Sequence, residues 1–200
     1  MAVNLVKGQK IDLTKGNAGL NKIMVGLGWE PVSAGKGFFA TMFGGGQKEI
    51  DCDSAVIMLS EGDKLDSTKD VIYFGNLTHA SNSVCHRGDN LTGEGAGDDE
   101  QIFIELKAVP SHINRLIFTV NIYDCISRKQ DFGMIKNAFI RVVDVATHQE
   151  IARYNLTENY QGCTALEVGE VYRHNGEWKF NAVGNGTNDT SLKEMIKRYL

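Results

Sequence analysis

Acidic side chains gather at both ends of one glycine-rich segment, residues 88–100, where their types and spacing suit the binding of a cation. The acidic and amide side chains at its two ends are Asp89, Asn90, Asp98, Asp99 and Glu100. Four glycines in the segment free the backbone to turn back, so the two ends are able to converge on one point. Like charges about 4 Å apart repel by roughly 4 kcal/mol at an effective dielectric near 20. Such a cluster must therefore reach water, bind protons or bind a metal.

Oxygen donors of this kind suit Ca²⁺, which accepts about six to eight carboxylate, amide and carbonyl oxygens in irregular geometry. The segment therefore predicts a calcium site, to which loop carbonyls such as that of Leu91 also contribute. The spacing is not that of an EF-hand, because Leu91 and Gly93 stand where that loop needs acidic or amide groups. A solvated acidic loop without metal is the alternative that the charge pattern leaves open.

Four further oxygen donors stand at the ends of predicted strands. Asp51 and Asp53 share one face at the start of a strand, because side chains two residues apart point the same way. Two others come where predicted strands end, and these are Asn76 and Asp124. The full set is large enough for two calcium ions.

Short apolar stretches separated by turn signals about every ten residues are typical of an antiparallel β-sandwich. The expected strands cover residues 5–13, 23–29, 50–59, 71–75, 101–107, 115–124, 138–145, 150–156, 165–173 and 177–183. Between them, the glycine-rich and aromatic segment 33–49 is either a binding flap or a hairpin that packs on itself. The fold class is therefore all-β, with the strands carrying the acidic clusters at their ends.

A short amphipathic helix is expected within residues 188–200. Ser191 and Glu194 have the spacing of a capping box, and apolar residues follow at helical intervals. We expect this helix to cover the sandwich, with partner docking or membrane docking as the alternative.

Length and composition favour one domain over residues 1–200 that works in the cytoplasm. Net charge −4 and a pI near 5.7 give no general attraction for nucleic acid or anionic lipid. The four cysteines lie far apart with no C-x-x-C pair, and no apolar leader or stretch of about 20 apolar residues is visible. Reduced thiols in a cytosolic chain are the expected state.

Catalytic motifs are sparse. The five histidines show no metalloprotease pairing, and neither a nucleophile elbow nor a P-loop is present. Cys85 and His86, next to the acidic segment, are the only pair that could supply a nucleophile or a soft ligand. We therefore expect no enzymatic activity, with a metal-dependent hydrolase or phosphoryl-transfer enzyme as the alternative.

Several motifs, taken together, resemble the TerD family of tellurite-resistance and stress proteins over nearly the whole chain. They are Lys7–Lys15, Val25–Trp29, Gly88–Gly95 with Gly97–Glu100, Phe132–Gly133, and Gly176–Phe180 with Val183–Gly184. The resemblance implies a cytoplasmic β-sandwich, C2-like in style, that binds Ca²⁺ at loops gathered at one end. By position, the acidic segment 88–100 matches the family's acidic loop, and Asp51 with Asp53 matches its Asp-x-Asp strand start.

The chain departs from the family pattern at Cys52 and Ser54–Ala55 and in a longer glycine-rich segment before Asp51. These departures indicate a diverged paralogue whose flap has its own partner. The leading hypothesis is a calcium-binding, non-enzymatic module whose ordered loops present a surface to other stress or tellurite-resistance proteins. Calcium-dependent peripheral membrane binding through Phe38, Phe39 and Phe43 is a further alternative.

Overall fold

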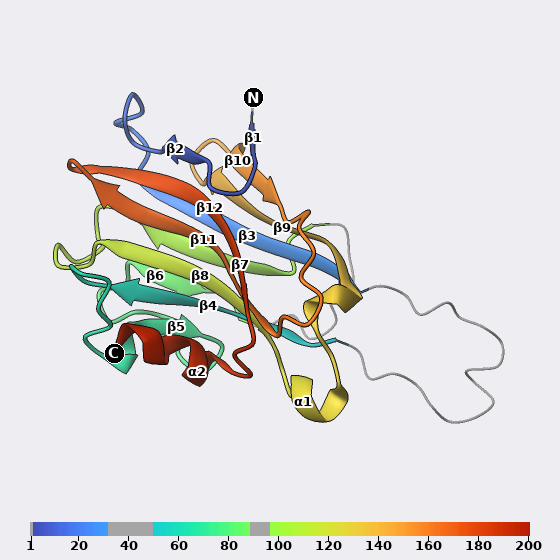
Figure 1. The fold of residues 1–200 in the computed structure, drawn as a ribbon. Coiled ribbons are helices and arrows are strands. Elements are labelled where there is room, and N and C mark those ends of the chain that lie inside the picture. Colours follow the sequence, from blue (N-terminus) through green and yellow to red (C-terminus); the bar gives the residue numbers. More distant parts are fainter. Residues whose placement is uncertain (1, 32–49, 89–96) are drawn as a thin grey trace.

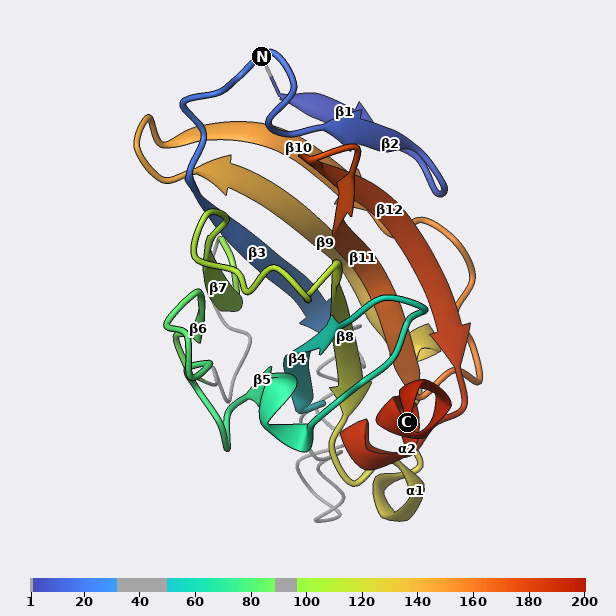
Figure 2. The same ribbon diagram turned by 90° about the vertical axis from the view of Figure 1, so that its left-hand side faces the viewer.

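The protein is described by a computed structural model that covers residues 2–31, 50–88 and 97–200. In these residues twelve strands form two six-stranded sheets that pack face to face (Figures 1 and 2). The first sheet, in spatial order, contains β1 (Val3–Leu5), β10 (Gln149–Asn155), β9 (Ile135–Asp144), β3 (Lys22–Pro31), β7 (Glu100–Glu105) and β6 (Val84–His86). The second contains β2 (Lys10–Asp12), β12 (Glu177–Thr187), β11 (Ala165–His174), β8 (Arg115–Ile122), β4 (Cys52–Leu59) and β5 (Val71–Tyr73). The expected all-β sandwich is confirmed.

The helical elements of the described residues are short. They are α1 (Cys125–Arg128), α2 (Leu192–Ile196) and three 3-10 turns at Thr68–Asp70, Phe132–Met134 and Lys197–Tyr199. The N-terminus and α2 lie at opposite ends of the molecule (Figures 1 and 2). None of the helices in the described ranges combines the length and the apolar character that a membrane span requires. The four cysteines are all free, and Cys52 and Cys125 are buried.

Alternation along the strands builds the core between the sheets. In β3, Ile23, Val25 and Leu27 are fully enclosed and belong to the main core cluster, whereas Gly26 and Gly28 face outward. The central strand β8 is buried on both faces, because Phe118 points into the core and Ile117 joins a second apolar cluster on the outside. The outer face of the second sheet therefore needs a cover of its own.

The strand expected over residues 5–13 was wrong in one respect, because the chain crosses from one sheet to the other within it. β1 pairs in parallel with β10, and β2 pairs antiparallel with β12. Gly8 has φ +81°, a conformation that glycine adopts without steric cost and that allows the turn between the two short strands. The parallel pair is the one exception to antiparallel pairing among the described strands. Strand β6 was also missed, because three residues are too few to show a pattern.

Helix α2 supplies the cover of the second sheet. Its apolar side chains, with Tyr199 from the following turn, pack against the outer cluster of Ile57, Leu59, Leu65, Val71 and Ile117. Ser191 is the N-cap and accepts a hydrogen bond from the Glu194 amide, as expected. The Glu194 carboxylate reaches back to the amide and hydroxyl of Thr190 rather than to Ser191, so the capping box is displaced by one residue. The helix is shorter than expected, since a 3-10 turn begins at Lys197.

We expect Met195→Ala to lower the free energy of unfolding by about 2–5 kcal/mol, since the Met195 side chain is fully buried beneath α2 and its loss leaves a cavity. Urea unfolding followed by circular dichroism measures the change. Lys197→Ala, on an exposed residue of the following turn, is the matched control and should change stability by less than about 0.5 kcal/mol. Equal stabilities of the two variants would contradict a structural role for the helix.

Candidate functional site

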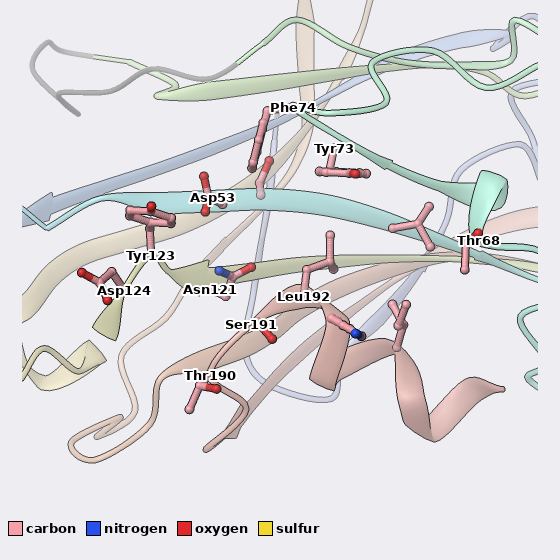
Figure 3. A pocket seen from close by; sticks show the side chains of 14 residues that line it. Asp53, Thr68, Tyr73, Phe74, Asn121, Tyr123, Asp124, Thr190, Ser191 and Leu192 are labelled. Atoms are coloured by element: carbon pink, nitrogen blue, oxygen red, sulfur yellow. The ribbon is translucent and has the colours of Figure 1, made fainter. Parts of the chain in front are cut away.

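The start of β4 and the end of β8 lie side by side and bring three predicted ligands together. The Tyr123 amide donates a hydrogen bond to the Asp51 carbonyl at 2.8 Å, and Asp53 stands opposite Asn121 in the β4–β8 register. Asp53 and Asp124 line the same groove, and Figure 3 shows their side chains at one end of it. Asp51, Asp53 and Asp124 therefore share one end of the sandwich.

Asp99 reaches the same end from the first sheet. Its amide donates to the Leu27 carbonyl at 2.7 Å, and its carboxylate accepts a hydrogen bond from the Trp29 amide at 2.7 Å. The next residue, Glu100, crosses the core and accepts a hydrogen bond from the Ser54 amide of β4 at 3.1 Å. The end of the acidic segment is therefore joined to the strand that begins with Asp51 and Asp53.

The thiol of Cys52 lies close enough to these carboxylates for their negative charges to act on it. Burial, followed by the charges of Asp51, Asp53, Glu100 and Asp99, holds its pKa well above the usual value, so the thiol stays protonated. The pKa of Asp99 is also raised, first by burial and then by Asp98, Glu100 and Glu30, although the hydrogen bond from Trp29 opposes the shift. Carboxylates are thus concentrated where like charges repel.

The Glu100 side chain points inward and is buried, and its carboxylate contacts His86 and Ser54. Its carboxylate lies 3.3 Å from His86 Nε2, and the same ring nitrogen lies 3.0 Å from Ser54 Oγ. His86 Nδ1 accepts a hydrogen bond from the Gly88 amide at 3.0 Å, which assigns the ring hydrogen to Nε2. All three side chains are buried.

These residue types are those of a serine hydrolase, but the geometry differs from what that chemistry needs. In a catalytic triad, one ring nitrogen takes the proton of the serine and the acid holds the other nitrogen. Here serine and acid both face Nε2, and a backbone amide occupies Nδ1. The cluster therefore fastens β4, β6 and β7 together beneath the acidic end.

Asp98 is held by a different partner on the outer face of the first sheet. Its two carboxylate oxygens accept hydrogen bonds from Arg141 Nε at 2.6 Å and Nη2 at 2.8 Å, and its side chain has no exposed area. The carboxylate lies directly over Gly26, where an added Cβ would stand 2.3 Å from it. The hydrogen bonds that Arg141 donates to Asp98 raise the pKa of Arg141, so the guanidinium stays charged. Both oxygens of the Asp98 carboxylate therefore bind Arg141.

The other predicted ligands lie elsewhere. Asn76 uses its side-chain amide to close the turn after β5, where Nδ2 donates to the Val71 carbonyl at 2.8 Å and to that of Lys69 at 3.2 Å. Asp89, Asn90 and Leu91 lie outside the described residues. Within residues 2–31, 50–88 and 97–200, no three His, Cys, Asp or Glu side chains are arranged to hold a metal by themselves. The other described carboxylates at the acidic end are those of Asp51, Asp53, Asp99 and Asp124.

Arg128, which the sequence analysis did not single out, stands among these carboxylates. It ends the short helix α1, and its guanidinium lies 3.9 Å from Asp51 Oδ2 and 3.7 Å from Asp124 Oδ2, over the ring of Tyr123. The buried Nε atom has no hydrogen-bond partner among the described residues. The spacing of four residues between Asp124 and Arg128 is the sequence signal that could have revealed it.

Comparisons with protein-family models and with curated proteins point to one family, and comparison with solved structures agrees in the fold. The TerD domain family model matches residues 1–199. The chain is 61% identical to the stress response protein SCP2 of Bacillus subtilis over the full length of both, and 44% identical to the tellurium resistance protein TerD of Serratia marcescens over 93% of this chain and 91% of that protein. The crystal structure of a TerD homologue from Streptomyces coelicolor shares the fold, with a TM-score of 0.66 at 18% identity over 90% of this chain and 98% of that chain.

We expect Asp98→Asn to lower the free energy of unfolding by about 1.5–3 kcal/mol, because the ion pair with Arg141 is lost. The loss should be the same in EGTA and in Ca²⁺, since this carboxylate is already paired. Denaturant unfolding in both buffers measures it, with exposed Asp66→Asn as the control. A loss seen only in Ca²⁺ would instead assign Asp98 to a metal.

Proposed function

Because this chain belongs to the TerD family, we propose that it is a calcium-binding, non-enzymatic module of a stress-resistance system. Members of the family carry names that refer to stress response, tellurium resistance and resistance to chemical damage. The observation that carries the calcium proposal is the gathering of Asp51, Asp53 and Asp99 around the start of β4. Repulsion among these groups favours a bound cation over an empty cluster.

The chemistry of the donors fits a hard cation. The carboxylates of Asp51, Asp53, Asp99 and Asp124 offer only oxygen donors. In this proposal the Asp89 carboxylate, the Asn90 amide oxygen and the Leu91 carbonyl, which the sequence analysis named, would complete the set. Ca²⁺ accepts such an irregular oxygen set more readily than Mg²⁺, which demands a tight octahedron and retains its waters. The ion would supply positive charge that ties the strand ends to the acidic segment.

Asp98 and Glu100 have a supporting role in this proposal. Asp98 is anchored to Arg141 on one side of Asp99, and Glu100 to Ser54 and His86 on the other. The two anchors restrict the backbone at Asp99, so its carboxylate needs little ordering when a cation binds. The burial of Ser54 and His86 supports the non-enzymatic part of the proposal, since neither is presented to a substrate.

The binding of a partner completes the proposed function. A cation at the acidic end would order the surface where β4, β7 and β8 meet, and other stress-resistance proteins are the partners we propose. Free cysteines in all four positions suit a reducing cytoplasm, which is where we place this activity.

The first test of this function compares melting curves in EGTA, Mg²⁺ and Ca²⁺. Ca²⁺ at about a hundredfold excess over its Kd should add about 2.7 kcal/mol of stability, and Mg²⁺ less. Asp99→Asn should melt at the wild-type temperature or above it in EGTA, because the neutral amide keeps an oxygen for the Trp29 amide and removes repulsion. The variant should lose most of the Ca²⁺ response.

The expected rise in the melting temperature of Asp99→Asn in EGTA follows from the raised pKa of Asp99. A carboxyl whose folded pKa lies above its unfolded value costs stability at every pH above the folded pKa, and the cost disappears as pH falls below the unfolded value. Replacing it with asparagine removes this cost at neutral pH. If Ca²⁺ shifts wild type and Asp99→Asn equally, or shifts neither, the calcium proposal fails.

A second test concerns Arg128, which already offers a positive charge to Asp51 and Asp124. Arg128→Met should lower the melting temperature in EGTA, because the two carboxylates lose their cation, and should tighten Ca²⁺ binding severalfold. Isothermal titration calorimetry measures the affinity. Lys129→Met, which removes the same charge from the neighbouring residue, is the control and should leave the affinity within about twofold. Weaker binding by Arg128→Met would contradict competition between Arg128 and Ca²⁺.

A further inference from the structure

A groove of about 420 Å³ lies on the outer face of the second sheet, between β5 and α2 (Figure 3). This volume is within the range of sites that hold small ligands or a few side chains. Its apolar walls include Val71, Tyr73 and Phe74 on the β5 side and Leu192 and Ile196 on the helix. Figure 3 shows Phe74 and Tyr73 facing Leu192 across β4 and β8.

The groove exists because α2 is too short to cover the whole face. Its five residues pack over Ile57, Leu59 and Ile117, which lie toward the far ends of β4 and β8. Toward Asp53 and Asn121 the sheet continues past the start of the helix. A segment from another molecule would lie alongside α2 and extend the apolar layer that the helix begins.

Large apolar side chains surround the opening. Phe74 and Tyr123 line the groove and are each 52% exposed. Half-exposed aromatic side chains beside a pocket are typical anchors of protein interfaces. These two aromatic side chains therefore favour a polypeptide as the occupant of the groove.

One end of the groove is acidic. Asp53 and Asp124 line it beside Tyr123, as Figure 3 shows, and the Asp124 side chain is 42% exposed. Asp51 lies next to this end and shares the Arg128 guanidinium with Asp124. Both distances to Arg128 exceed hydrogen-bond length, so a guanidinium or ammonium that hydrogen-bonds to Asp124 directly would be the better partner.

We propose that this groove binds a short peptide segment of a partner protein in which Lys or Arg stands next to aromatic or aliphatic residues. The apolar side chains occupy the space between Phe74 and Leu192, and the basic group meets Asp53 and Asp124. Apolar burial supplies affinity, and the acidic end fixes the direction in which the segment lies.

The probe is a phage-displayed random heptapeptide library selected on the full chain in EGTA. Asp53 and Asp124 are also proposed ligands of Ca²⁺, which would compete with the basic side chain for them, so the selection is done without metal. Its outcome is then independent of whether Ca²⁺ binds. The expected consensus combines a basic residue with apolar residues nearby. Selection on the double variant Asp53→Asn/Asp124→Asn should keep the apolar positions and lose the preference for Lys or Arg. No enrichment, or an acidic consensus, would overturn the proposal.

The synthetic consensus peptide, labelled with fluorescein, then locates the site by fluorescence polarisation. Phe74→Ser should weaken its binding at least tenfold, and so should the double aspartate variant. The controls are Val6→Ser, at an equally exposed apolar residue near the N-terminus, and Asp66→Asn. Melting curves show that each variant is folded. Unchanged affinity in the groove variants, or equal loss in the controls, would place the peptide elsewhere and refute the proposal.

Discussion

The acidic end of this sandwich depends on one buried carboxylate, Glu100, which joins the two sheets. Burying a charge costs several kcal/mol unless polar contacts compensate it, and here the Ser54 amide donates a hydrogen bond to the carboxylate and His86 Nε2 lies 3.3 Å from it. Because Ser54 lies near the start of β4 and Glu100 begins β7, the contact holds the starts of these two strands, one from each sheet, against each other. Asp99 and Asp53, each next to a partner in this contact, are thereby brought to a common end. The like charges at that end are gathered by a contact that lies beneath them.

Much of the fold could be predicted from the sequence, because alternation and turn residues act locally. The strand around Phe118 and the cap at Ser191 are of this kind. The directions of the acidic side chains were not predictable. Side chains two residues apart share a face only within a strand, but Asp98 precedes the first residue of β7, so its carboxylate binds Arg141 on the outer face while Glu100 enters the core. Arg141 is 43 positions from its partner, and no local pattern connects the two. A cluster in the sequence therefore became three separate environments in space.

The same end of the molecule combines two kinds of surface. Carboxylates at the starts of β4 and β7 concentrate negative charge, and the groove beside them has apolar walls that come from β5 and α2. Arg128 lies at the junction, within ion-pair range of Asp51 and Asp124 and stacked on Tyr123. A change in charge at this junction acts on the aromatic side chain that borders the groove. The acidic end and the apolar groove are therefore physically continuous.

The chain crosses from one sheet to the other at Gly8, and this crossing affects when its first two strands are able to pair. β1 pairs with β10 and β2 with β12, so the first strands of the chain find partners about 150 to 170 residues later. Non-local pairings of this kind close long loops and slow folding. During synthesis, β1 has no strand to join until β10 has been translated, and β2 has none until β12 has been translated. We therefore expect the sheet edges that these strands form to close late in folding.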